Sequence, residues 1–106
     1  MRKDKVKIIV FVPETHTDII REVIGRAGGG KIGKYTFCSF SVKGVGRFKP
    51  GKGAKPSLGR INKLESVAEE RIEFVCDRRL VKKILAEIKN KHPYEEVAYD
   101  IYPLLN

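Results

Sequence analysis

The segment KVKIIVFVP, residues 5–13, decides the fold of this chain. Its apolar run, Ile8–Val12, is not interrupted by polar residues. Such a run predicts a strand that is buried on both faces and therefore lies in the middle of a sheet. Pro13 ends the strand, because proline has no N–H group to donate to a neighbouring strand. The rest of the chain is then expected to pack around this strand.

Two amphipathic helices are predicted. In each, apolar residues recur at i, i+1, i+4, i+5 and i+8, which places them on one helix face. The first set is Ile19, Ile20, Val23, Ile24 and Ala27, and the second is Leu80, Val81, Ile84, Leu85 and Ile88. Gly28–Gly30 end the first helix. The His92–Pro93 pair ends the second, because a residue before proline disfavours helical backbone angles.

Three further strands complete the pattern, at residues 35–43, 65–76 and 97–102. The order β-α-β-β-α-β predicts one α+β domain over residues 1–106 with a ferredoxin-like fold. In that fold a four-stranded antiparallel sheet carries two helices on one face. The other face is uncovered within one chain, and aromatic residues on it would favour self-association.

The composition is that of an ordinary globular domain. The 106 residues are 42% apolar and 33% charged, which argues against wholesale disorder. No apolar run is long enough to cross a bilayer, and no secretion signal is recognisable. Cys38 and Cys76 form no C-x-x-C pair and are expected in the core. We therefore expect a cytoplasmic protein with no membrane partner.

The net charge of +9 is unevenly distributed along the chain. No Asp or Glu occurs between Glu22 and Glu65. The same stretch contains ten basic residues: Arg26, Lys31, Lys34, Lys43, Arg47, Lys49, Lys52, Lys55, Arg60 and Lys63. This pattern predicts one strongly positive region and an anionic partner.

The basic, Gly- and Pro-rich segment at about residues 44–63 is the strongest functional candidate, since loops of this length usually serve binding. Its candidate anion-binding residues are Arg47, Phe48, Lys49, Lys52 and Lys55. Lys31 and Lys34 could extend this set, with the neighbouring glycine N–H groups cradling a phosphate. The alternatives are a loop that packs within an oligomer and an ordinary glycine cap of a helix.

A divalent metal site is a weaker hypothesis. His92, Glu95 and Glu96 carry suitable ligand atoms close together in sequence. A proline-containing turn with exposed carboxylates explains the same residues equally simply. No complete catalytic set is visible, so we predict no catalytic residues and a protein that is not an enzyme.

Several strings of this chain resemble a known domain. They are Val12–Glu14, Gly30–Tyr35, Cys38–Phe40, Gly44–Pro50, Gly53–Pro56, Gly59, Leu64–Glu73 and His92–Asp100. Together they resemble the PII-like (CutA-like) domain of the dinuclear-metal-centre, Nif-three-like proteins, which also occurs as a free-standing short protein. The string His92–Asp100 is the most specific. Gly28–Gly30 and Lys34 depart from the usual pattern and make the first loop more basic.

The resemblance implies a ferredoxin-like fold that assembles as a homo-oligomer, often a trimer. It also implies a regulatory module over a catalytic body carried elsewhere, so the metal-dependent chemistry of full-length proteins does not transfer to this chain. We therefore expect a module that binds a small ligand, a metal ion or a partner protein. The alternative is a basic nucleic-acid-binding domain, although the aromatic signature of RNA-recognition modules is missing.

Overall fold

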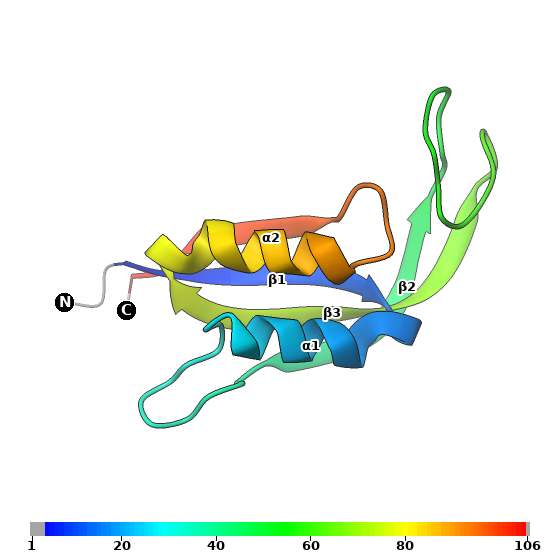
Figure 1. Cartoon of the computed structure of the whole chain (residues 1–106). Helices are drawn as coiled ribbons and strands as arrows, with labels where there is room; N and C mark the ends of the chain where they lie inside the picture. The colour runs from blue at the N-terminus through cyan, green and yellow to red at the C-terminus, as the bar shows by residue number, and fades with distance from the viewer. Residues whose placement is uncertain (1–3, 106) are drawn as a thin grey trace.

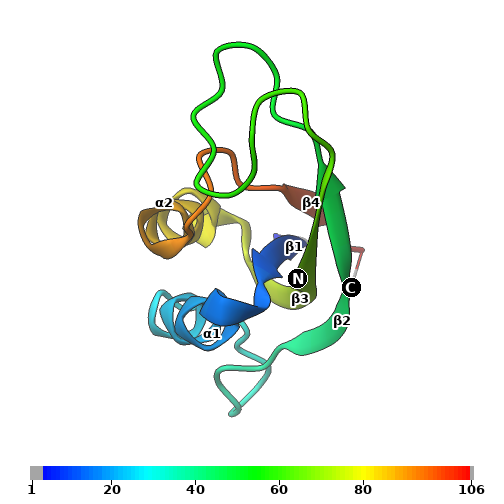
Figure 2. The same ribbon diagram turned by 90° about the vertical axis from the view of Figure 1, so that its right-hand side faces the viewer.

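The computed structural model describes residues 4–105 and confirms the ferredoxin-like fold. The elements are β1 (Lys5–Pro13), α1 (Thr17–Arg26), β2 (Phe40–Phe48), β3 (Glu65–Asp77), α2 (Val81–Lys91) and β4 (Tyr99–Pro103). Short 3-10 turns, Glu14–His16 and Arg78–Leu80, lead into the two helices. The four strands are antiparallel in the order β2-β3-β1-β4, and both helices cover one face of the sheet (Figures 1 and 2).

The core lies between this sheet face and the two helices. Ile8 pairs with Phe74 of β3 and with Ile101 of β4, as expected for the central strand. Ile20 of α1 and Ile84 of α2 are completely buried against the sheet. The second cysteine, Cys76, belongs to the same core, and burial raises the pKa of its thiol to about 11. A thiol with a raised pKa stays protonated and unreactive.

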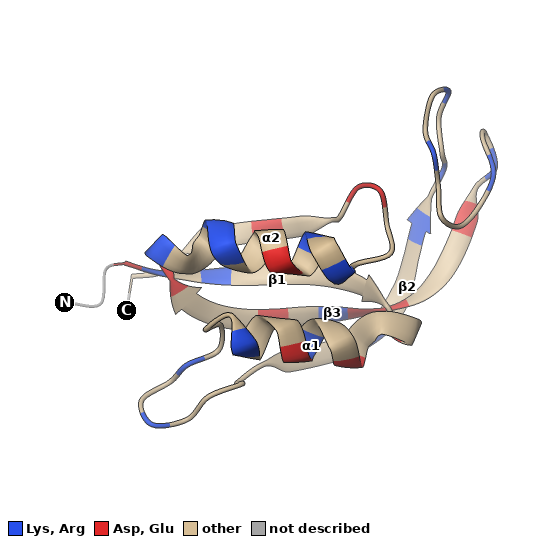
Figure 3. Ribbon diagram, in the orientation of Figure 1, with Lys and Arg blue, Asp and Glu red and all other residues tan. Residues whose placement is uncertain are grey.

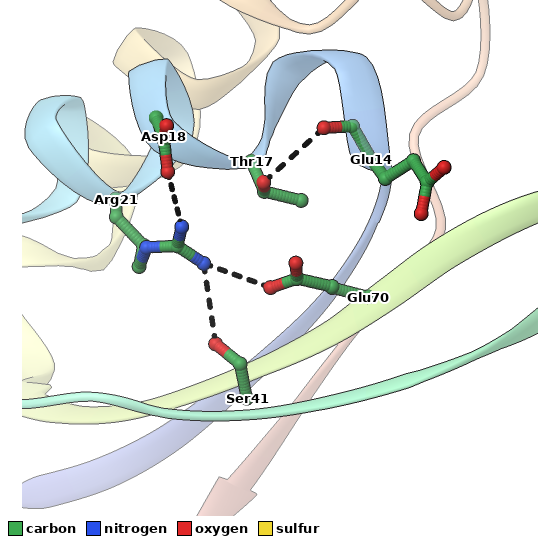
Figure 4. A network of polar contacts seen from close by, with 6 residues as sticks. All are labelled: Glu14, Thr17, Asp18, Arg21, Ser41 and Glu70. Atoms are coloured by element: carbon green, nitrogen blue, oxygen red, sulfur yellow. Dashed lines mark hydrogen bonds and ion pairs between the residues drawn. The ribbon is translucent and has the colours of Figure 1, made fainter.

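One charged network ties α1 to the sheet (Figure 4). The Arg21 guanidinium donates to Glu70 Oε1 at 2.8 Å and to Ser41 Oγ at 3.4 Å, and it also pairs with Asp18. Glu70 is one of the few buried charged residues of the described chain. A buried carboxylate needs such a partner, because removing a charge from water is costly.

The second strand lies later in the chain than the sequence predicts. Residues 35–39 belong to a loop, and β2 begins at Phe40 and continues through the glycines at 44 and 46. The Phe37 ring packs onto Gly25 of α1, where even a methyl group would come within 2.0 Å of it. This contact between distant residues holds the loop off the sheet and leaves Cys38 half-buried outside the core. The alternating pattern alone could not show it.

Candidate functional site

The β2–β3 hairpin extends beyond the rest of the sheet. β1 pairs with β3 only as far as Glu69, so β3 residues 65–68 pair with β2 alone. We call these residues, β2 residues 45–48 and the connecting loop 49–64 the arm. It projects at one end of a molecule that measures 48 × 22 × 22 Å (Figure 1). The loop therefore starts at residue 49 rather than at about 44 as predicted.

The loop of the arm has an organised backbone. The Asn62 N–H donates to the Pro50 carbonyl at 2.6 Å, and the Ala54 N–H donates to the Gly51 carbonyl at 3.0 Å. The Lys55 N–H donates to Glu95 Oε1 at 2.9 Å, which connects the loop to the turn between α2 and β4. These bonds limit the conformations of the loop and so present its side chains in a restricted arrangement.

The basic side chains form two groups instead of the single region predicted from the sequence. Arg47, Lys49, Lys52 and Lys55 are exposed on the arm. Lys31 and Lys34 are exposed on the loop between α1 and β2, at the other end of the molecule (Figure 3). Within residues 4–105, only Arg26 of the ten basic residues in this stretch forms an ion pair, with Glu22 at 2.7 Å. The charges of the arm are thus available to a partner.

The glycines beside Lys31 do not offer a phosphate cradle. The N–H groups of Gly28, Gly29 and Gly30 donate to the carbonyls of Gly25, Ile24 and Val75 at 3.1, 2.9 and 2.7 Å. Their backbone donors are therefore used within the fold, as in an ordinary helix ending. These three N–H groups are therefore not available to an anion that binds near Lys31 and Lys34.

A pocket of about 540 Å³ lies where the arm meets the turn between α2 and β4. Its lining includes Phe11 of β1, Phe48 of β2, Glu69 of β3, Leu58 of the loop and Tyr94 of the turn. The Phe48 and Tyr94 rings lie 6.0 Å apart with their planes tilted by 53°. The pocket is therefore mostly apolar, with one half-buried carboxylate.

His92 connects two residues that line this pocket, Phe11 and Tyr94. Its Nε2 donates to the Phe11 carbonyl at 2.8 Å, and its Nδ1 accepts the Tyr94 N–H at 3.1 Å. This pair of bonds requires the neutral ring with its proton on Nε2. Burial lowers the pKa of His92 and so favours the same neutral form.

Tyr94 and Glu69 form the polar contact inside the pocket. The Tyr94 hydroxyl donates to Glu69 Oε2 at 3.0 Å. Burial raises the pKa of Tyr94, and the hydrogen bond to the Glu69 carboxylate raises it further. The phenol therefore stays protonated and remains a donor over the physiological pH range.

The predicted metal ligands do not converge. Both ring nitrogens of His92 are engaged in hydrogen bonds, and Glu95 accepts the Lys55 N–H. No group of three His, Cys, Asp or Glu residues in the described part of the chain is arranged to hold a metal ion. Metal binding stays a prediction that this geometry does not support.

Sequence reasoning did not identify Glu69 and Tyr94 as site residues. Glu69 alternates along the strand with Glu65, Arg71 and Glu73, a pattern that is typical of charges paired across strands. Glu73 does pair with Arg71 at 3.0 Å and with Lys7 at 3.4 Å. Glu69 instead enters the pocket, and only the string of residues 92–100 hinted that the facing turn was distinctive.

The fold and the long β2–β3 hairpin define a ferredoxin-like domain of the PII/CutA type. The solved CutA structure of Xylella fastidiosa is similar over 97% of this chain and 86% of that chain, with a TM-score of 0.69 and 16% identity. At this identity the similarity concerns the fold alone.

Relatives at higher identity are Nif-three-like proteins. The solved structure of a Bacillus cereus protein related to NIF3 matches 98% of this chain at 43% identity, with a TM-score of 0.85, and this chain covers 26% of it. Curated proteins named "GTP cyclohydrolase 1 type 2 homolog" match at 50% identity in Halalkalibacterium halodurans and 46% in Bacillus subtilis. They cover 94% and 92% of this chain. No family model matches.

The chain is a PII/CutA-like domain related to the Nif-three-like proteins. It spans about a quarter of the length of the curated relatives it matches, 27% and 26% for the two named above. The name those relatives carry marks homology and is not evidence of catalysis by this chain. No helix within residues 4–105 is long and apolar enough to cross a membrane.

Proposed function

We propose that this chain is a non-catalytic, oligomeric binding module with a regulatory role, whose arm recognises an anionic ligand or the acidic surface of a partner protein. One observation carries this proposal: Arg47, Lys49, Lys52 and Lys55 project from an organised hairpin and form no ion pair within residues 4–105. Positive charges gathered on a projecting element attract anionic partners and accelerate their association.

The uncovered sheet face supports self-association. By register, Phe40 and Val42 of β2 and Tyr102 of β4 point away from the helices, and they are 65%, 49% and 50% exposed. Among residues 4–105 no strand pairs with the outer edge of β2, which is the first strand in the order β2-β3-β1-β4. Exposed apolar residues beside a long free edge favour pairing with a second copy of the chain. We propose a homo-oligomer, with the trimer as the expected state.

The non-catalytic role is supported by the chemistry of the nucleophile candidates. Cys76 is buried with a raised pKa, and the Cys38 thiol contacts the Thr36 carbonyl at 3.9 Å rather than a base. His92 uses both ring nitrogens to hold the turn. A thiol needs a neighbouring base to become a nucleophile, and within residues 4–105 the Cys38 thiol donates to a carbonyl instead.

Nucleic-acid binding is the alternative, because unpaired lysines and arginines also neutralise phosphates. One titration series distinguishes the two functions. A fluorescent poly-glutamate peptide and a single-stranded RNA oligonucleotide are each titrated against the chain by anisotropy at low and high salt. We expect the peptide to bind at least as tightly as the RNA. Clear preference for the RNA would support the alternative.

A matched pair of triple variants tests the site. Lys49, Lys52 and Lys55 are changed to Gln in one, and Lys82, Lys83 and Lys91 of α2 in the other, so that both lose the same charge. We expect about a tenfold or greater loss of peptide affinity only in the first. Equal losses would mean that net charge alone attracts the peptide.

Light scattering after size exclusion tests the proposed homo-oligomer, which should persist in high salt. A monomer in all conditions would contradict it.

A further inference from the structure

The pocket beneath the arm differs in charge from the arm itself. Although the chain carries a net charge of +9, three carboxylates, Glu69, Glu95 and Glu96, line this pocket, against two basic residues, Arg47 and Lys49. Of these five charged residues only Glu69 is half-buried, and the other four are exposed. The inner part of the pocket is therefore acidic within a basic protein.

Glu69 lacks the cationic partner that its neighbours on β3 have. Glu70 pairs with Arg21 at 2.8 Å, and Glu73 pairs with Lys7 and Arg71. Glu69 accepts one hydrogen bond, from Tyr94, and forms no ion pair within residues 4–105. A half-buried carboxylate in apolar surroundings gains stability when a ligand supplies the opposite charge.

The position of this carboxylate depends on a glycine. A methyl group built on Gly46 of β2 would come within 2.1 Å of Glu69 Oε1. The Tyr94 hydroxyl holds the other oxygen, Oε2, at 3.0 Å. Because the phenol stays protonated, it fixes the carboxylate without neutralising it. Glu69 can then accept a further hydrogen bond from a ligand.

The remaining walls suit the apolar body and the charge of an organic cation. The aromatic rings of Phe11, Phe48 and Tyr94 line the pocket with Leu58 and Ala98. Aromatic faces attract ammonium groups, and they also pack against apolar groups. The pocket volume of about 540 Å³ lies in the range of small-molecule sites.

We infer that this pocket binds a small organic cation, in which an ammonium group pairs with Glu69 and an apolar or aromatic body packs against Phe48 and Tyr94. Arg47 and Lys49 belong both to the arm and to the wall of this pocket, whereas Glu69 and Tyr94 lie outside the arm, so variants of these two residues test the pocket independently. A cation is favoured over a neutral ligand because only a cation supplies the charge that Glu69 lacks.

Three probes with the same aromatic body test the charge. 2-Phenylethylamine, 2-phenylethanol and phenylacetate are titrated into the isotope-labelled full chain and followed by amide chemical shifts. We expect the amine to bind with shifts centred on residues 46–48, 69 and 94–98, at least about tenfold more tightly than the alcohol. Phenylacetate should bind most weakly. Equal binding of amine and alcohol, or absence of amine binding up to about 10 mM, would overturn the inference.

Glu69→Gln keeps the acceptor for Tyr94 and removes only the charge. It should weaken amine binding about tenfold or more, while Glu87→Gln, an exposed change on α2, should leave it unchanged. If Glu69→Gln perturbs folding, Tyr94→Phe keeps the ring and should still lower the affinity several-fold. Unchanged affinity in the folded variant would refute the role of Glu69. Poly-glutamate binding should be retained in these variants, which separates this result from failure of the arm.

Discussion

The helix-covered half of the sheet and the arm are stabilised in different ways. In the first, the side chains of β1, α1 and α2 interlock, and residues such as Ile8, Ile20 and Ile84 are fully buried. In the arm, most side chains are exposed, and hydrogen bonds that include those at Pro50, Gly51 and Glu95 organise the loop. Stability depends on the first region, so the second can carry unpaired charge at little cost to the fold.

The largest loss of stability should come from a cavity in the helix-covered half of the sheet. Ile84→Ala removes a completely buried side chain of α2, and we expect a loss of about 3 kcal/mol in the free energy of unfolding. Ile19→Ala on α1 is the matched control, because Ile19 is 45% exposed, and it should cost less than about 1 kcal/mol. Chemical denaturation measures both. Similar losses would break the proposed contrast between covered and exposed positions.

The next largest loss of stability should come from breaking the ion pair between Arg21 and Glu70 (Figure 4). Arg21→Met leaves the buried Glu70 carboxylate without its cation, and we expect a loss of about 2 kcal/mol because Arg21 is itself partly exposed. Arg26→Met breaks the exposed pair with Glu22 and should cost about 0.5 kcal/mol or less. Denaturation at neutral pH compares the two, and equal costs would contradict the structural role of Glu70.

A smaller change in the free energy of unfolding is expected when the pH is lowered. Because burial lowers the pKa of His92, the unfolded chain binds a proton more readily than the folded chain. His92 therefore makes its whole contribution to the free energy of unfolding above its ordinary pKa of 6.5. This contribution decreases as the pH falls toward the lowered pKa of the folded chain. His92→Gln should reduce this pH dependence of the free energy of unfolding, whereas His16→Gln should retain most of it, because the charge of His16 is only a minor cause of the lowered pKa of His92. The opposite ranking would show that His92 titrates like an exposed imidazole.

The smallest effect on stability should come from the arm. Changing Lys49, Lys52 and Lys55 together to Gln removes exposed charges that have no ion-pair partner in the described part of the chain. The free energy of unfolding should be unchanged within error, while poly-glutamate affinity falls. A large change in stability would show that these lysines support the fold and would remove the distinction between the two regions.

The sequence predicted the covered half well, because burial on both faces of β1 and the stripes of the helices are local patterns. It misplaced β2, since the contact of Phe37 with Gly25 joins segments whose proximity no local pattern reveals. The alternation of Glu69, Arg71 and Glu73 likewise does not reveal that Glu69 lines a pocket.

The candidate site was predicted only in part. The basic residues of the arm were identified, but Lys31 and Lys34 lie at the other end of the molecule. The pocket combines residues from β1, β2, β3 and the turn after α2. These residues come together only through the strand order and the bend of the arm. The sequence alone therefore identifies Phe48 but not Glu69 or Tyr94.

Hydrogen–deuterium exchange of the full chain, with and without the poly-glutamate peptide, tests the central claim most directly. We predict slow exchange in β1 that the peptide does not change, and fast exchange in residues 49–64 that slows when the peptide binds. Protection confined to residues 31–34 or to the helices, with residues 49–64 unchanged, would contradict the assignment of binding to the arm.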